Sequence, residues 1–268
     1  MKIFIDTADI DEVKEGMTWG VADGITTNPS LIKKAQEKHK VKDMNSYIKN
    51  LCKTVGKGKD VSLEVIGTDA KTMISQGLTL YKKFNKVANN VVIKIPVNPA
   101  TNDDPNFDGI KAIKALASKG IGINTTLIFT PEQAWLAAKA GAKYVSPFAG
   151  RIDDDLRKKA NITFEKPDYY PATGKEYKEK PLEDNGIISG IHLCKQIRLL
   201  LDNFNYKTQI IAASLRNARQ IREAALVGAH VATIPFSALT TTLTHYKTAE
   251  GMNAFLADTV KEYEAVFK

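Results

Sequence analysis

Residues 91–97, Val-Val-Ile-Lys-Ile-Pro-Val, and residues 123–129, Ile-Asn-Thr-Thr-Leu-Ile-Phe, decide the fold. Each stretch is a short and nearly continuous apolar run, which is typical of a parallel strand that is buried on both faces. Between them, residues 109–119 place Ile110 and Ile113 on one face of an amphipathic helix. The order strand, helix, strand therefore predicts one β/α unit of a parallel sheet.

The same alternation repeats along the whole chain. Eight units in about 240 residues match the size of a (β/α)8 barrel, so we predict an α/β fold with a single barrel domain over residues 1–268. A doubly wound open sheet is the alternative, but such sheets usually carry a glycine-rich phosphate loop after the first strand, and Asp6-Thr-Ala-Asp9 is not one. The predicted strands are Ile3–Ile5, Gly24–Thr27, Val61–Ile66, Val91–Val97, Ile123–Phe129, Tyr144–Phe148, Gln209–Ala213 and Val231–Pro235.

Three segments depart from this rhythm. A polar loop, Asn98–Asp108, follows the fourth strand, and a longer charged and proline-rich insertion at about 158–183 follows the sixth. Loops of that length in a compact domain tend to be lids or insertions. Residues 249–268 have the periodicity of one amphipathic C-terminal helix beyond the eight units. We expect this helix to cross one barrel end or to pack on a neighbouring subunit of a homo-oligomer.

Composition excludes several classes of partner. The net charge is +8, but the lysines are interleaved with acids, as on solvated helix faces, so we predict no nucleic-acid partner. No apolar run approaches the roughly 20 residues that span a bilayer, and the first residues enter a strand at once, so we predict neither a membrane anchor nor a signal peptide. Cys52 and Cys194 form no paired motif and are expected to be buried thiols. We therefore expect a soluble cytoplasmic protein.

The four histidines do not indicate a metal site. Three of them lie in helix or loop patterns, and His230 begins a strand at the end opposite to catalysis. No spacing resembles a zinc site. We predict neither a metal nor a cofactor. The four are His39, His192, His230 and His245.

Polar residues near the C-terminal ends of the predicted strands are the main functional signal. In a (β/α)8 barrel these ends converge on one face, where the catalytic groups of such folds lie. Exposure to solvent does not readily explain a ring of polar side chains in the strands, because the interior of a barrel is packed with apolar side chains. The ring comprises Asp6, Asn28, Glu64, Lys94, Asn124, Thr126, Ser146, Ser214 and Arg216.

Lys94 is the clearest candidate for a catalytic group. It lies inside an apolar strand, where desolvation disfavours the charged ammonium. A neutral amine attacks carbonyl groups and forms Schiff bases. The alternatives are a structural ion pair with Glu64, or a lysine of an edge strand whose amine reaches solvent.

The remaining candidate residues could also have purely structural roles. Asp6 and Glu64 are suited to divide the proton transfers of imine chemistry, but Asp6 is also a possible helix N-cap and Glu64 a possible salt-bridge partner. Ser214 and Arg216 precede a helix and suit a phosphate group, or they form an N-cap with a surface arginine. Arg151 adds a second positive group, or it pairs with one of the acids in residues 153–155.

Seven motifs, taken together, resemble those of the transaldolase family. They occur in order from residue 6 to about residue 235. Each motif is only moderately specific, but seven in register are strongly so. The motifs are Asp6-Thr-Ala, Thr26-Thr27-Asn28-Pro29-Ser30-Leu31, Ser62-Leu-Glu64-Val, Ile93-Lys94-Ile95-Pro96, Asn124-Thr-Thr126-Leu, Ser146-Pro-Phe148-Ala-Gly-Arg151-Ile-Asp153 and Ala213-Ser214-Leu-Arg216.

The resemblance implies an enzyme of carbohydrate metabolism that acts on phosphorylated sugars in the non-oxidative pentose phosphate pathway. Such an enzyme transfers a dihydroxyacetone unit from sedoheptulose 7-phosphate to glyceraldehyde 3-phosphate. Lys94 matches the Schiff-base lysine and Asp6 the acid/base carboxylate, while Glu64 and Thr126 match the pair that holds the catalytic water. The implied substrate-binding residues are Asn28, Asn124 and Ser146 for the dihydroxyacetone portion, Arg151, Ser214 and Arg216 for the phosphate, and Thr26 and Phe148 at the same mouth.

Two positions separate transfer from simple cleavage within this superfamily. The related fructose-6-phosphate aldolases, which release free dihydroxyacetone, carry Gln where this chain has Glu64 and Tyr where it has Phe148. A tyrosine hydroxyl would help to protonate the enamine, whereas Phe148 has no proton to donate. The resemblance therefore favours a transaldolase, with the aldolase as the alternative. A non-catalytic barrel that binds a polyanionic partner is the third hypothesis.

The chain also departs from the family pattern. Leu215 stands where Phe is usual, which alters the wall of the implied phosphate pocket, and Ala149 stands where Val is common. The insertion at about 158–183 is absent from the short members of the family. We expect it to cover the mouth of the barrel or to form an interface.

Overall fold

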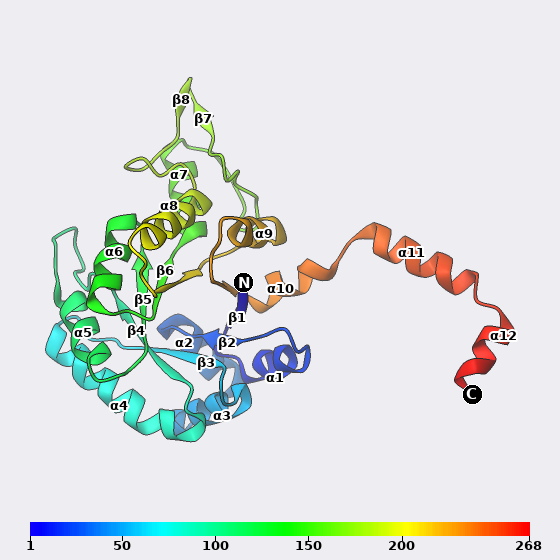
Figure 1. Cartoon of the computed structure of the whole chain (residues 1–268), viewed down its shortest axis with the longest axis horizontal. Coiled ribbons are helices and arrows are strands. Elements are labelled where there is room, and N and C mark those ends of the chain that lie inside the picture. Colours follow the sequence, from blue (N-terminus) through cyan, green and yellow to red (C-terminus); the bar gives the residue numbers. More distant parts are fainter.

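The computed structural model describes all 268 residues and contains a closed barrel of eight parallel strands (Figure 1). The order around the barrel is β1-β10-β9-β6-β5-β4-β3-β2. This confirms the predicted barrel and every predicted strand, with ends that differ by one or two residues. The strands are β1 (Lys2–Asp6), β2 (Gly24–Thr26), β3 (Asp60–Glu64), β4 (Val91–Pro96), β5 (Ile123–Ile128), β6 (Tyr144–Pro147), β9 (Gln209–Ala212) and β10 (Val231–Ile234).

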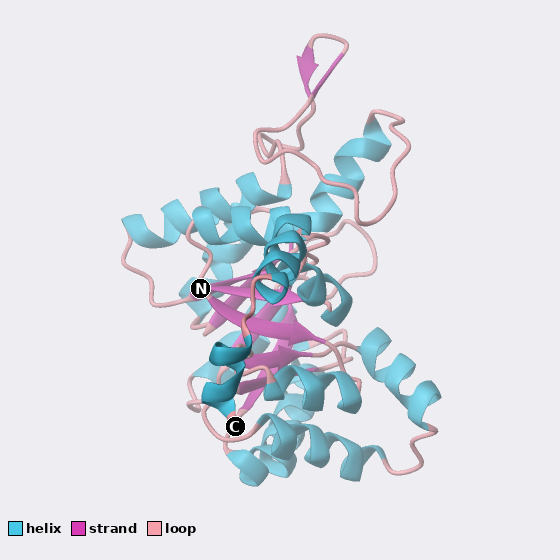
Figure 2. Cartoon of the chain, turned by 90° about the vertical axis from the view of Figure 1, so that its right-hand side faces the viewer, coloured by secondary structure: helices cyan, strands magenta, loops and turns pink.

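Helices surround the barrel and bury one continuous apolar core against it (Figure 2). Their starts follow local chemistry: Thr130 and Gln133 form the capping box of α6, whose first residue is Pro131. The helices are α1 (Ile10–Thr18), α2 (Pro29–His39), α3 (Met44–Val55), α4 (Ala70–Ala88), α5 (Asp108–Ala117), α6 (Pro131–Ala140), α7 (Ala149–Lys159), α8 (Gly190–Asn203), α9 (Ala218–Leu226) and α10 (Phe236–Thr240). No helix is long and apolar enough to cross a membrane.

Strand register brings the polar strand ends together. Glu64 of β3 pairs with Lys94 of β4, and Lys94 pairs with Asn124 of β5. Side chains that share a register level in a parallel barrel point to the same side, so these three meet at one depth. Three residues of the predicted ring, Glu64, Lys94 and Asn124, are therefore neighbours at the C-terminal end of the barrel.

The insertion lies between α7 and α8. Its far part is an antiparallel hairpin of β7 (Glu176–Tyr177) and β8 (Lys180–Pro181), which projects away from the barrel (Figures 1 and 2). Its near part, residues 160–172, packs against the barrel helices, with Tyr170 buried in the core.

The C-terminal segment differs from the single helix expected over residues 249–268. After a short turn, η1 (Thr241–Leu243), it forms α11 (Tyr246–Ala257), α12 (Lys261–Glu264) and a last turn, η2 (Ala265–Phe267). The break falls at residues 258–260, where Val260 is extended and β-branched residues disfavour a helix. The segment runs outward from the barrel as an arm (Figure 1).

Candidate functional site

A pocket of about 720 Å³ opens at the C-terminal end of the strands. Every residue predicted to bind substrate lines it, as do Asp6 and Lys94. Glu64 and Thr126 do not line it. Glu64 faces a smaller neighbouring cavity of about 350 Å³ that is walled partly by apolar side chains of α2 and α3.

Lys94 lies at the base of this pocket and is almost fully buried, with 5% of its surface exposed. Its Nζ lies 3.1 Å from Oε2 of Glu64 and donates a hydrogen bond of 3.1 Å to the carbonyl oxygen of Thr27. The ion pair with Glu64, one of the alternatives, is therefore present. It does not exclude a catalytic amine, because Lys94 also borders the pocket.

Two buried oxygens on β3 and β5, the strands that flank the Lys94 strand, retain hydrogen-bonding capacity. Oε2 of Glu64 makes the ion pair but no hydrogen bond, and Oγ1 of Thr126 has no partner in the protein. Buried polar atoms are normally satisfied, so unpaired ones near a pocket are suited to hold a water molecule or a substrate hydroxyl.

A chain of hydrogen bonds orders the next layer. Ser146 Oγ donates to Oδ1 of Asn124 over 2.6 Å, and Nδ2 of Asn124 donates to Oγ of Ser62 over 3.2 Å. All three side chains are buried. The chain fixes which way the Asn124 amide faces. Ser62 lies in the Ser62-Leu-Glu64-Val motif but was not predicted as a site residue. The signal that could have indicated it is its position two residues before Glu64, on the same face of the strand.

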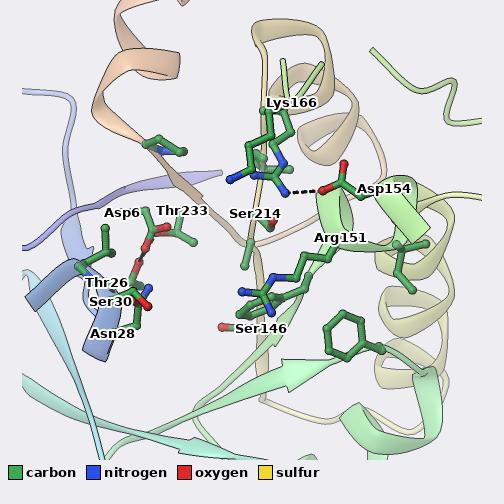
Figure 3. A pocket seen from close by; sticks show the side chains of 18 of the residues that line it. Asp6, Thr26, Asn28, Ser30, Ser146, Arg151, Asp154, Lys166, Ser214 and Thr233 are labelled. Atoms are coloured by element: carbon green, nitrogen blue, oxygen red, sulfur yellow. Dashed lines mark hydrogen bonds and ion pairs between the residues drawn. The ribbon is translucent and has the colours of Figure 1, made fainter. Parts of the chain in front are cut away.

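Asp6 belongs to a second cluster, with Thr26 and Thr233, on the side of the pocket away from Arg151 (Figure 3). Its Oδ1 accepts a hydrogen bond of 2.7 Å from Thr26, whose hydroxyl also contacts that of Thr233. Asp6 is not the N-cap of α1, because Asp9 takes that place. Burial raises the pKa of Asp6, although Lys94, the Thr26 hydroxyl and Arg216 oppose the shift. Thr233 was not predicted as a site residue, because threonine is common in strands.

The third part of the pocket is cationic and begins at Ser214. This residue has a left-handed backbone, with φ of 62°, which is uncommon outside glycine and concentrates at functional sites. A Cβ on Gly150 would lie 2.1 Å from the Ser214 carbonyl oxygen and 2.6 Å from Nε of Arg216. Only glycine at position 150 lets α7 approach this segment so closely.

Hydrogen bonds fix both the side chain and the backbone of Arg216. Its Nη2 donates to Oδ2 of Asp154 over 2.8 Å, and its backbone N–H donates to Oε1 of Gln220 over 2.8 Å. Gln220 in turn donates to Asp153, and burial raises the pKa of Asp153 to about 7. The alternative of a free surface arginine is wrong, because Arg216 is largely buried and lines the pocket.

Arg151 lies beside Ser214 at this end of the pocket (Figure 3). It makes no ion pair with residues 153–155, so that alternative is wrong. Its guanidinium lies over the ring of Phe148, with 5.0 Å to the ring centroid. A stacked guanidinium keeps its N–H donors free for an anion.

Several lining residues were not predicted, and most come from helices or the insertion rather than from strand ends. No local pattern distinguishes them from solvated surface residues, so only the tertiary structure places them. They are Ser30, Leu31, Lys34, Phe129, Ile152, Asp154, Asp155, Lys158, Lys166, Asp184, Ala213, Thr233 and Pro235.

One group of side chains has the ligand types of a metal site. Asp9, Asp11 and His39 present ligand atoms within 4.8 Å of one another. However, Asp9 already accepts from Lys38 over 2.5 Å and contacts His39 over 2.9 Å, and Asp11 is exposed. A cation there would have to displace Lys38, so we assign no metal to this group.

Comparison with known proteins shows the family of this chain. Residues 3–268 match the family model described as Transaldolase/Fructose-6-phosphate aldolase. A protein of Desulfatibacillum aliphaticivorans named probable transaldolase is 41% identical over 258 residues, which cover 96% of this chain and 97% of the relative. Proteins with the same name from Thermoplasma acidophilum and Aquifex aeolicus are 38% and 37% identical over 96% and 100% of the chain, and over 95% and 100% of their own lengths. The chain therefore belongs to the transaldolase/fructose-6-phosphate aldolase family.

Proposed function

We propose that this enzyme is a transaldolase that carries a dihydroxyacetone unit from sedoheptulose 7-phosphate to glyceraldehyde 3-phosphate. The products are erythrose 4-phosphate and fructose 6-phosphate, as in the non-oxidative pentose phosphate pathway, which we place in the cytoplasm. The observation that carries the proposal is a buried amine, Lys94, at the base of a pocket whose far end holds Arg151 and Arg216. An amine of this kind attacks a ketone, and the arginines suit a phosphate.

The first half of the reaction forms and cleaves the imine. Lys94 first gives a proton of its ammonium to Glu64, and the free amine attacks C2 of the donor ketose. Glu64 returns that proton to the hydroxyl of the carbinolamine, which leaves as water, and a protonated imine remains. Asp6 takes the proton from the C4 hydroxyl, and the C3–C4 bond breaks as the aldose leaves. The electron pair of that bond moves to the imine, which becomes a neutral enamine on Lys94. The imine thus acts as the electron sink for the broken bond.

The second half reverses these steps with a new partner. The enamine carbon attacks the aldehyde of the acceptor, and Asp6 returns its proton to the new alkoxide. Water then adds to the imine and releases the ketose and the free amine. Glu64 and Thr126 support this hydrolysis, because each has a buried oxygen able to hold the water near Lys94. Asn28, Asn124 and Ser146 bind the dihydroxyacetone hydroxyls, beside Thr26.

Reduction with borohydride tests the imine. Incubation with fructose 6-phosphate and borohydride should add one reduced dihydroxyacetone or hexose phosphate unit to the chain, and peptide mapping should place it on Lys94. A secondary amine resists hydrolysis, so the site of attachment is preserved. A label on another lysine, or no label, would contradict the proposal.

The partition between transfer and cleavage depends on Phe148 and Glu64. Phe148 lines the pocket and offers no proton to the enamine, so the enamine persists until an aldehyde arrives. We expect Glu64→Gln combined with Phe148→Tyr to shift activity from transfer toward release of free dihydroxyacetone by about a hundredfold, the lower end of the range for a single positioned proton donor. The measurement is fructose 6-phosphate cleavage with and without erythrose 4-phosphate.

The matched control is Phe129→Tyr, which adds a hydroxyl to the neighbouring ring, whose centroid lies 5.8 Å from that of Phe148. This variant should leave the ratio unchanged. Wild-type cleavage that is equally fast without an acceptor would instead support fructose-6-phosphate aldolase, the alternative within the same family.

We further propose that the enzyme is a homo-oligomer and that residues 244–268 join its subunits. Their large apolar side chains are exposed on the single chain, and the segment runs away from its own barrel (Figure 1). Apolar area of this kind is normally buried on a partner. These side chains are Tyr246, Met252, Phe255, Leu256, Val260, Tyr263, Val266 and Phe267.

Truncation to residues 1–243 should reduce the mass measured by light scattering to that of one chain, because the joining surface is lost. The barrel core should remain folded, since residues 244–268 contribute nothing to it. A full-length protein that is itself monomeric would disprove the role of the arm.

A further inference from the structure

The insertion carries a turn, residues 165–168, that is fixed to the barrel. The carbonyl oxygen of Pro167 accepts a hydrogen bond of 3.0 Å from Nδ2 of Asn217, the residue that follows Arg216. The carbonyl oxygen of Asp168 accepts one of 2.8 Å from Nη2 of Arg157 on α7. The turn is therefore tied to the same segment that holds the cationic end of the pocket.

Aromatic contacts reinforce this attachment. The buried guanidinium of Arg157 lies 4.8 Å from the ring centroid of Phe164 and 5.1 Å from that of Tyr170. Tyr169 donates a hydrogen bond of 2.6 Å to Glu223 of α9, and the guanidinium of Arg219 lies 3.8 Å from its ring centroid. Contacts on both sides of the turn make it a rigid wall of the pocket, not a loose surface loop.

Lys166 extends from this turn to the pocket. It lies at the same end as Ser214 and Arg151, away from Asp6 and Asn28 (Figure 3). The carboxylates at this end already have cationic partners: Asp154 pairs with Arg216, and Asp155 and Asp184 both pair with Lys159, at 2.9 and 2.8 Å.

Lys166 itself makes no ion pair and no side-chain hydrogen bond. The ammonium has three donors, and near a pocket end that already holds two arginines it would be repelled unless an anion lies between them. Lys34 and Lys158 also line the pocket without an ion pair. Lys34 lies on α2, and Lys158 lies in the last turn of α7, where the helix dipole favours a cation. The Lys166 turn is instead hydrogen-bonded to the residue beside Arg216.

We propose that Lys166 is a specificity-determining residue, a third cation that binds the phosphate of the sugar together with Arg151 and Arg216. The proposal rests on the proposed function only in taking the ligand to be a sugar phosphate. In this proposal, the near part of the insertion adds a third cation to the two arginines that the barrel places at the phosphate end of the pocket.

Binding of glucitol 6-phosphate tests this without catalysis, because the alcohol has no carbonyl and forms no imine. Lys166→Ala should weaken its binding, measured by titration calorimetry, by about tenfold, as expected for loss of one charge-assisted contact. Lys166→Arg should restore binding to within about threefold of wild type, because it keeps the charge. In turnover assays, Lys166→Ala should raise KM for fructose 6-phosphate and leave kcat unchanged.

The matched control is Lys180→Ala, which removes an equal charge from the distant hairpin and should leave binding unchanged. The proposal would be overturned if the wild type and Lys166→Ala bound with equal affinity, or if both alanine variants weakened binding equally. It would also be overturned if the wild type did not bind glucitol 6-phosphate. A wild type that performs no transfer, together with selective weakening in Lys166→Ala, would refute the proposed function and leave the phosphate role of Lys166 intact.

Discussion

Lys94→Met is expected to lower kcat for dihydroxyacetone transfer by at least about ten-thousandfold, as losses of a covalent nucleophile do. The methionine thioether cannot form an imine, so no bond to the substrate replaces the one lost. Transfer from fructose 6-phosphate to erythrose 4-phosphate measures the rate, and borohydride labelling of the intact chain should disappear with it.

This substitution needs a control for stability. It removes the partner of Glu64 at 3.1 Å, and breaking a buried pair costs about 3–5 kcal/mol because one charge is left uncompensated. Lys94→Met with Glu64→Gln removes both charges and should recover the melting temperature without recovering activity. Recovery of activity in this double variant, or borohydride labelling of Lys94→Met itself, would show that another residue carries the imine.

Asp6→Asn has the second-largest expected effect, a fall in kcat of about a hundredfold to ten-thousandfold, which is the range for a positioned acid/base group. The amide keeps the shape of the side chain and can still accept the hydrogen bond from Thr26. It cannot take the proton of the C4 hydroxyl. Carbon–carbon cleavage should therefore fail while the imine still forms on Lys94.

The pH dependence separates this role from a structural one. Burial raises the pKa of Asp6, so its carboxyl keeps a proton at a pH where an ordinary aspartate, with a pKa of about 3.9, is ionised. Cleavage needs the ionised form, so the wild-type rate should fall as pH drops through the raised pKa. The Asn variant should lack this acid limb.

Stability should change with pH in the opposite sense. Because the folded pKa lies above the unfolded one, the stability linked to Asp6 is fully present below the unfolded pKa and is lost as pH rises through the folded pKa. Asp6→Asn should flatten that part of the melting-temperature profile. An acid limb that persists in the Asn variant, or loss of imine labelling with it, would show that Asp6 is not the acid/base group of cleavage.

Much of the candidate site could be predicted because its residues occupy anomalous positions in regular elements. Lys94 stands out in Val-Val-Ile-Lys-Ile-Pro because the flanking residues define a buried strand, and Asp6 and Glu64 stand at comparable strand ends. A parallel barrel places all such ends on one face, so each local anomaly also gave an approximate location. Thr233 and Ser62 carried weaker signals, since hydroxyl residues are ordinary in strands.

The sequence by itself determined the eight strands, the barrel and the ring of polar strand ends, because periodicity and local capping are written in neighbouring residues. Only the tertiary structure decided which polar side chains contact one another. Closure of the barrel sets the Thr26 hydroxyl against Thr233, 207 positions away. Docking of the insertion brings Lys166 to the pocket, and packing of α7 against the segment after β9 pairs Asp154 with Arg216 rather than with Arg151. Such contacts depend on how distant segments pack, and no local pattern of residues specifies that.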